Sequence, residues 1–386
     1  MKVLHVSNIP SHHQIPLGKA MIDILGKGNY YFAFTGNSNI DRKKNGWNLD
    51  VNYEWILQPN SSSEDQKQYL MAWREFDLVL TGEQLLDLIS ERLNNKRLTF
   101  YMSERWWKPP IGKLRLLHPL FAKKMLRFRY LSKNESFYYL AIGKYAYYDL
   151  KLFTCFNKRT LSWGYFTERP PQTDVRTYHQ GKAIKILWMG RMLDWKQVDK
   201  VIHACEYLNG KGIPFNLTLI GDGPEKQKLM SLAKQKLSVG SYEFNDFLKS
   251  EYVYEEMRCH DIYIMPSNGY EGWGAVVNEA MSVGLCVVAS NKIGSACSLI
   301  DNEENGFLFD PDNQVKLNSI IEKVSQSPEL INKIKQNAIT KINKLWSPLV
   351  AAKRLIQMSN ELIQHQDATS YEIGPLSSWG TKSNDC

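Results

Sequence analysis

The sequence predicts an α/β protein made of two doubly wound, Rossmann-like domains that face one central cleft. Its 386 residues exceed one ordinary core and suit two domains of roughly 150–200 residues each. Short strand patterns alternate with helical patterns in both halves, which is typical of parallel sheets covered by helices. A polar stretch with two prolines, residues 168–182 (ERPPQTDVRTYHQGK), separates the two series and is predicted to be a linker.

The first half, residues 1–167, begins with an apolar strand pattern and repeats it at short intervals. Strands are predicted at Lys2–Ser7, Tyr30–Thr35, Asp77–Thr81 and Leu98–Met102, with helices at Leu17–Leu25 and Gln84–Leu93. The runs Tyr138–Ile142, Tyr145–Leu150 and Leu161–Gly164 continue the alternation.

The second half, residues 183–345, restarts the pattern after the linker. Strands are predicted at Ile184–Met189, Asn216–Ile220, Ile262–Met265 and Cys286–Ala289. Helices are predicted at Val198–Leu208, Glu225–Lys236, Val276–Val283 and Leu330–Asn343. A closing helix within residues 346–365 is expected to return to the N-terminal domain, and the polar residues 366–386 are expected to form a flexible tail.

The composition, 43% apolar and 23% charged, is that of a globular protein. No run approaches the roughly 18 apolar residues of a spanning helix, and the opening MKVLHVSNIP is expected to be a strand rather than a secretion signal. The six cysteines include no CxxC pair, which favours a cytoplasmic setting over a disulfide framework or a zinc site. The net charge of +8 favours acidic partners such as phosphates, nucleic acid or anionic lipid.

Two strand ends in the second half carry residues suited to a phosphorylated ligand, and ligands of parallel sheets bind at the carboxyl ends of strands. Gly190 ends one strand, and Arg191 and Lys196 follow it, as suits a diphosphate. Gly221 and Gly223 end the next strand, where glycine lets the backbone approach a ligand. Read alone, each motif is equally consistent with solvated cations in a loop or with an ordinary tight turn.

A third strand end has the sequence PSNGYEGWGAVVNEAMSVGLCVVAS. Gly272 and Gly274 shape a turn, and a helix that begins near Ala275 could hold a phosphate at its N-terminus. Glu279 could then accept hydrogen bonds from a ribose, and Glu271 could reach further hydroxyls of the same ligand. Without the other two strand ends, the pair could be two solvated carboxylates.

Over Ile184–Pro311 these motifs resemble, in order and spacing, the family 4 glycosyltransferases, which are retaining enzymes of the GT-B fold. Their E-x7-E motif falls on Glu271 and Glu279, and their pyrophosphate-binding pair falls on Arg191 and Lys196. The resemblance implies that Glu279 binds the ribose and Glu271 the donor sugar. It also implies no metal, because Arg191 and Lys196 stabilise the leaving group. The donor-binding residues that it implies are Gly190, Gly221, Gly223, Gly272, Trp273, Gly274, Ala275, Val276 and Glu279.

The sequence departs from this family at several places. Glu243–Asp246 replaces the common F-x-G, Cys286 stands where proline is usual, and the first loop keeps only Gly18 of its glycines. Many members have a histidine after the strand that corresponds to Leu98–Met102, where this chain has Ser103, Glu104 and Arg105. The candidates for the acceptor side are Glu104, His12, His13, Arg105, Trp106 and Trp107, and the alternative for them is polar loop groups.

Residues 105–133 contain nine Lys or Arg and no Asp or Glu, interleaved with aromatic and aliphatic residues. This pattern suits peripheral contact with an anionic membrane. The same composition could bind single-stranded nucleic acid, or belong to a solvated basic helix with its apolar side in the core. Beside a glycosyltransferase-like half the membrane interpretation is favoured, on the inner face of the membrane and with no nucleic-acid partner.

The sequence therefore predicts retaining, metal-independent transfer of a sugar from a UDP- or GDP-sugar, with no other cofactor. The expected acceptor is a hydroxyl of a growing glycan or polyisoprenoid-linked saccharide in surface polysaccharide biosynthesis. A non-catalytic nucleotide-sugar-binding subunit and a basic nucleic-acid-binding protein remain alternatives. A nicotinamide oxidoreductase is disfavoured because no G-x-G-x-x-G follows a strand.

Overall fold

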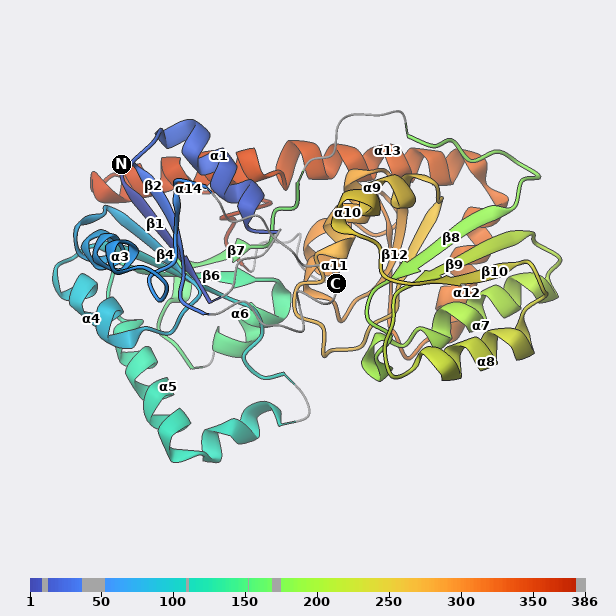
Figure 1. Cartoon of the computed structure of the whole chain (residues 1–386), viewed down its shortest axis with the longest axis horizontal. Coiled ribbons are helices and arrows are strands. Elements are labelled where there is room, and N and C mark those ends of the chain that lie inside the picture. The colour runs from blue at the N-terminus through green and yellow to red at the C-terminus, as the bar shows by residue number, and fades with distance from the viewer. Residues whose placement is uncertain (9–12, 37–52, 109–110, 152, 169–174, 380–386) are drawn as a thin grey trace. The chain divides into compact units, whose positions relative to one another are not determined.

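The computed structural model describes residues 1–8, 13–36, 53–108, 111–151, 153–168 and 175–379 (Figure 1). The described chain divides into two compact units. Unit 1 contains residues 1–168 together with 345–379, and unit 2 contains residues 175–344. Each unit has its own parallel sheet. The predicted acceptor-side residue His12 and residues 169–174 of the predicted linker lie outside the described residues.

Unit 1 is built on a parallel sheet that, in the described part of the chain, has the strand order β3-β2-β1-β4-β5-β6-β7. The strands are β1 (Val3–Ser7), β2 (Tyr30–Phe34), β3 (Ile56–Leu57), β4 (Leu78–Thr81), β5 (Leu98–Ser103), β6 (Phe137–Ile142) and β7 (Thr160–Trp163). The sheet is buried on both faces, which explains why its strands are nearly continuous apolar runs.

Helices cover the two faces of this sheet. They are α1 (Ile15–Leu25), α3 (Ser63–Glu75), α4 (Leu86–Asn94), α5 (Pro119–Leu131), α6 (Lys144–Lys151) and α14 (Pro348–Ile363), with 3-10 turns η1 (Gly112–Leu117) and η2 (Asn157–Arg159). Helices α1 and α14 pack against each other on one face, while α3 and α4 lie on the other (Figure 1). Helix α14 begins where Ser347 caps it, its hydroxyl accepting from the Val350 N–H at 3.3 Å.

The segment after α14 differs from the predicted flexible tail. Leu376 is buried in unit 1, and residue Ser378 pairs with Leu161 of the edge strand β7. The Trp379 indole stacks on the Tyr147 ring with 5.5 Å between centroids. Residues 371–379 are thus packed against unit 1, because a few apolar side chains in this polar stretch are enough to anchor it.

Unit 2 has a second parallel sheet, with the order β10-β9-β8-β11-β12-β13 among the described residues. The strands are β8 (Ile184–Met189), β9 (Phe215–Ile220), β10 (Tyr242–Asn245), β11 (Ile262–Met265), β12 (Cys286–Ser290) and β13 (Phe307–Phe309). The helices are α7 (Asp199–Gly210), α8 (Lys226–Lys236), α9 (Ser250–Arg258), α10 (Val276–Ser282), α11 (Gly294–Leu299), α12 (Gln314–Gln326) and α13 (Pro328–Leu345), with the 3-10 turn η3 (Asp194–Lys196).

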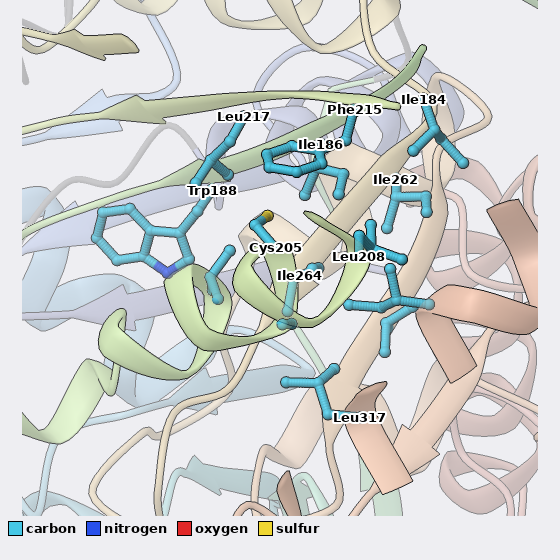
Figure 2. Close-up of a cluster of buried hydrophobic side chains, with 14 of the residues drawn as sticks. Ile184, Ile186, Trp188, Cys205, Leu208, Phe215, Leu217, Ile262, Ile264 and Leu317 are labelled. Atoms are coloured by element: carbon cyan, nitrogen blue, oxygen red, sulfur yellow. The ribbon is translucent and has the colours of Figure 1, made fainter. Parts of the chain in front are cut away.

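The core of unit 2 lies between its sheet and the helices α7, α8 and α12 (Figure 1). Figure 2 shows its centre, where Cys205 and Leu208 of α7 meet Trp188 of β8 and Ile264 of β11. The packing fixes the strand ends that carry the candidate site. The second half of the predicted linker also belongs to this unit, because Arg176 pairs with the buried Asp261 at 3.2 Å.

The predicted fold class, α/β with two doubly wound Rossmann-like domains, is confirmed. The strand order of unit 2 is the 3-2-1-4-5-6 order of that fold, with the chain reversing direction across the sheet between β8 and β11. The same reversal falls between β1 and β4 in unit 1.

Candidate functional site

The candidate site of unit 2 lies at the carboxyl ends of β8 and β11, the two strands between which the strand order reverses. Loops that leave neighbouring strands in opposite directions open a crevice at this point, and it is where open parallel sheets bind ligands. Four sequence-predicted residues, Arg191, Lys196, Glu271 and Glu279, come from the loops and helix at this one edge.

The loop after β8 carries the two predicted cations. Gly190 continues the strand pairing by donating to the Ile220 carbonyl at 2.9 Å, and the Met192 N–H donates to the Asp222 carbonyl at 2.8 Å. The loop is therefore anchored to the next strand's loop on both sides of Arg191. The Arg191 side chain is exposed and has no acidic partner among the residues that the structure describes.

Lys196 and Glu271 meet in an ion pair that joins the loop after β8 to the loop after β11. Their side chains are only 15% and 13% exposed. A main-chain hydrogen bond of 3.0 Å from the Asn268 N–H to the Trp195 carbonyl ties the same two loops, and the Lys196 Nζ lies 4.5 Å from the centroid of the Trp195 ring. The charges are thus held in place by backbone and ring contacts.

Glu279 lies one turn into α10, following Ala275 and Val276, which are half-buried at the start of the helix. Burial removes its carboxyl from water and raises its pKa to about 8. Tyr263 of β11 is buried beside the site, and burial followed by the charges of Glu271 and Glu279 raises its pKa well above the usual value. Its hydroxyl donates to the Met189 carbonyl at 3.3 Å, which fixes the end of β8.

The glycines after β9 allow two backbones to approach closely. Gly221 has a φ of +136°, and a Cβ built on it would lie 1.9 Å from the Gly190 carbonyl oxygen. A Cβ on Gly223 would lie 2.4 Å from the Met192 carbonyl oxygen. Any side chain here would push the two loops apart, so these glycines are needed for the loop arrangement itself.

The turn Gly272–Gly274 is held by the first residues of α11. The Ser295 N–H donates to the Trp273 carbonyl at 2.8 Å, and the Ser295 hydroxyl donates to the Gly274 carbonyl at 2.9 Å. The Trp273 indole is fully buried and donates to the Asn278 side-chain oxygen at 2.8 Å. The Trp273 ring is thus enclosed within unit 2, and its contact with a donor stays a prediction.

Sequence reasoning missed three residues of this site. Tyr263 and Trp195 lack any motif of their own, and they are found only because the structure places them against Glu271 and Lys196. Lys226, at the start of α8, is a further cation at this edge and lies 2.6 Å from Asp246. Its position directly after the GDGP turn was the only available signal.

The candidates for the acceptor side all belong to unit 1, apart from His12, which lies outside the described residues. His13 stacks on Tyr165, with 6.3 Å between ring centroids. Glu104 pairs with Lys108 at 2.8 Å, one helical turn away in sequence. Arg105 lies 3.7 Å from the Asp149 carboxylate and covers the Tyr145 ring.

Trp106 and Trp107 are in the core of unit 1, at 7% and 4% exposure, in contrast to the predicted acceptor contact. Both backbone N–H groups donate to the Asp149 carboxylate, at 2.8 and 3.0 Å. Burial raises the pKa of Asp149, and these hydrogen bonds and Arg105 oppose the rise. The indoles therefore serve packing, because a buried ring cannot reach a substrate.

Among the described residues, no group of three His, Cys, Asp or Glu side chains is arranged to hold a metal ion. In the same part of the chain no helix combines the length and the apolar character that crossing a membrane requires.

Part of the chain that includes the candidate site is similar to a known protein family. Residues 173–341 match the family model of the group 1 glycosyl transferases. This match contains every donor-side candidate residue of the candidate site. It does not include unit 1.

The relatives are similar over a similar stretch. An uncharacterised glycosyltransferase of Haemophilus influenzae is 32% identical over 145 residues, 38% of this chain and 40% of that protein. A protein of Escherichia coli named provisionally as the colanic acid biosynthesis glycosyltransferase WcaL is 27% identical over 138 residues, 34% of each chain. The chain thus spans well under half the length of the curated relatives that it matches.

A solved structure of another protein is similar over nearly the whole chain. The crystal structure of Anabaena HepE in complex with UDP has a TM-score of 0.67 and 15% identity, covering 94% of this chain and 100% of HepE. At this identity the likeness shows the fold, which is GT-B, and nothing of the substrate.

Proposed function

We propose that this chain transfers a sugar from a nucleoside diphosphate sugar to a hydroxyl of a growing glycan or lipid-linked saccharide, with retention at the anomeric carbon and without a metal ion. The observation that carries the proposal is the half-buried Lys196–Glu271 ion pair, with the exposed Arg191 in the same loop as Lys196, at the strand ends where a parallel sheet binds ligands. The match to the group 1 glycosyl transferases over residues 173–341 supports it.

The ion pair supplies one cation and one acid for two parts of one donor. When a diphosphate enters, Lys196 can exchange the Glu271 carboxylate for a phosphate oxygen, and Arg191 can bind the second phosphate bidentately. Glu271 then becomes available to the hydroxyls of the donor sugar. In this exchange Lys196 gains a phosphate oxygen and Glu271 gains hydroxyl donors, so neither group is left without a hydrogen-bonding partner.

The reaction breaks the bond between the anomeric carbon and the diphosphate oxygen and forms a bond from that carbon to the acceptor oxygen. Negative charge develops on the departing diphosphate, and the two cations stabilise it without reorganising. The acceptor hydroxyl gives its proton to the departing diphosphate oxygen, so the step balances. Retention requires departure and attack on the same face of the sugar ring.

UDP and GDP sugars are the proposed donors. The complex of HepE with UDP supports UDP for a protein of this fold, and the name of WcaL supports a role in polysaccharide synthesis. Glu279, buried and close to Tyr263, is proposed to bind the ribose hydroxyls. The amides of Gly274, Ala275 and Val276 are proposed to bind a phosphate.

The experiment is a thermal-shift panel of UDP, GDP, ADP and CDP sugars, followed by a transfer assay with extracts that contain glycan and lipid-linked acceptors. A ligand at 100 times its dissociation constant stabilises the folded state by about 2.7 kcal/mol and raises its melting temperature. We expect a shift with UDP or GDP sugars. A flat response to all of them contradicts the proposal, and a shift without transfer indicates a non-catalytic binding subunit.

Variants at the ion pair test the assignment of roles. Lys196→Met and Glu271→Gln are each expected to lower turnover by about 100-fold or more, as the loss of a contact to developing charge does. The matched control is the exposed pair Lys323–Glu303 of the same unit, at 2.8 Å, whose variants Lys323→Met and Glu303→Gln should keep normal turnover. Near-normal turnover in either site variant would refute the assignment.

A further inference from the structure

One surface of unit 1 exposes large apolar side chains among cations. We call it the leucine–cation surface. Its apolar members are Ile111, Leu114, Leu117, Leu120, Leu126 and Tyr130. Its exposed cations are Lys113, Arg115, Lys123, Lys124, Arg127, Arg129 and Lys133.

The exposed leucines are not part of the core. Leu114, Leu117 and Leu120 are 65%, 79% and 74% exposed, and they lie in η1 and at the start of α5. Helix α5 has its own buried face, which contains Met125 and Phe128. Single exposed leucines are common, but a run of them at one end of a helix marks an interaction surface.

The cations of this surface are mostly uncompensated by nearby acids. From residue 105 to 133 the sequence contains no Asp or Glu. Among the described residues, the ion pair found for the surface is Arg127 with the exposed Asp87, at 2.5 Å. A groove of about 460 Å³ runs between α4 and α5, and Lys123, Lys124 and Arg127 line it together with leucines, Gln84 and Asp87, the carboxylate that pairs with Arg127. Apolar and cationic groups thus share one concave site.

We propose that the leucine–cation surface binds an anionic phospholipid bilayer. The leucines would enter the boundary between headgroups and acyl chains, while the lysines and arginines stay at the level of the phosphates. The groove between α4 and α5 would take a lipid phosphate beside apolar contacts. This binding is independent of the sugar transfer proposed above, because all of its residues belong to unit 1.

Single-stranded nucleic acid fits the surface less well. Such ligands bind by stacking bases on exposed aromatic rings along a basic groove. Trp106 and Trp107, the two indoles nearest to this surface in sequence, are buried in the core, and Tyr130 is the exposed aromatic ring of the set. A purely solvated basic face would not need leucines at this exposure.

The test is flotation of the full chain with vesicles of phosphatidylcholine alone and of phosphatidylcholine mixed with phosphatidylglycerol. Binding to the anionic vesicles is expected to be at least about tenfold stronger than binding to phosphatidylcholine alone, because each cation near an anionic surface adds to the binding free energy. Added salt should weaken it. Equal binding to both vesicles, or binding to neither, would overturn the proposal.

Two sets of variants separate the apolar and the charged contributions. Each of two triple variants should reduce vesicle binding at least about tenfold. The first combines Leu114→Ser, Leu117→Ser and Leu120→Ser. The second combines Lys113→Gln, Lys123→Gln and Lys124→Gln. The matched controls are Val239→Ser with Val315→Ser and Leu349→Ser, and Lys228→Gln with Lys234→Gln and Lys316→Gln, all at exposed positions elsewhere.

Unchanged vesicle binding in both variant sets would refute the assignment to this surface. Sedimentation equilibrium and filter binding to a single-stranded oligonucleotide complete the test. Self-association that the leucine variants abolish, in a chain that does not bind vesicles, would assign the surface to a second copy instead. Tight oligonucleotide binding without vesicle binding would equally overturn the proposal.

Discussion

Glu279 should make the stability of unit 2 depend on pH in a way that a single substitution removes. In the unfolded chain this carboxyl has its ordinary pKa of 4.5, whereas burial raises the pKa in the folded state to about 8. Between these pH values the Glu279 carboxyl ionises in the unfolded chain but stays protonated in the folded unit, so its ionisation lowers the free energy of the unfolded state alone. The free energy of unfolding therefore falls as the pH rises through this window.

The magnitude follows from the two pKa values. Each pKa unit corresponds to about 1.4 kcal/mol, so the loss of stability between pH 4.5 and pH 8 is at most about 5 kcal/mol. Glu279→Gln has the same size as the protonated acid and cannot ionise. The unfolding free energy of the variant minus that of the native chain should rise across this window and level off above it.

The assay is urea unfolding followed by tryptophan fluorescence, at pH steps from below 4.5 to above 8. The difference between the two chains isolates Glu279, because all other titrating groups are shared. Val288→Ala, in the core of unit 2, identifies the transition that belongs to this unit. A difference that stays constant over the window would show that Glu279 is ionised in the folded state and would refute the reasoning.

Three further outcomes are expected. Gly221→Ala places a methyl group on the carbonyl oxygen of Gly190, so we expect a lower melting temperature for unit 2 and a weaker nucleotide thermal shift, and a fully native shift would contradict the close approach. Trp107→Ala should cost about 3–5 kcal/mol of stability, measured by urea unfolding, because it empties a core site; a change confined to the KM for the acceptor would instead support a substrate contact. Deleting residues 371–379 should lower the melting temperature of unit 1 in a heat scan, because the deletion removes the buried Leu376 and the ring stack of Trp379. An unchanged melting temperature would support the predicted flexible tail instead.

Much of the fold could be predicted because buried parallel strands have sequences that are short apolar runs. The strands β8 and β11 begin and end at the predicted residues. The strand β10 was missed because it lies at the edge of the sheet, where its side chains alternate between half-buried and exposed. The six residues of α11 are too few to show a helical period.

The candidate site was only partly predictable. The acids and cations could be assigned to strand ends from their motifs, and the structure places them there. The pairing of Lys196 with Glu271, which are 75 residues apart, could not be predicted, because no local pattern records a contact across two loops. Trp106 and Trp107 were assigned to a surface because an aromatic residue beside cations gives no indication of its burial.

The division of the chain has a consequence for how the protein is made. Unit 1 needs helix α14, which packs on α1 from the far end of the sequence, whereas unit 2 is one continuous stretch. A ribosome that delivers the chain from its N-terminus therefore completes unit 2 before unit 1 has its last helix. Helix α1 therefore lacks its partner α14 through the synthesis of the 195 residues 169–363, from the end of the first stretch to the end of α14. Unit 1, whose first stretch is translated before unit 2, is thus completed after it.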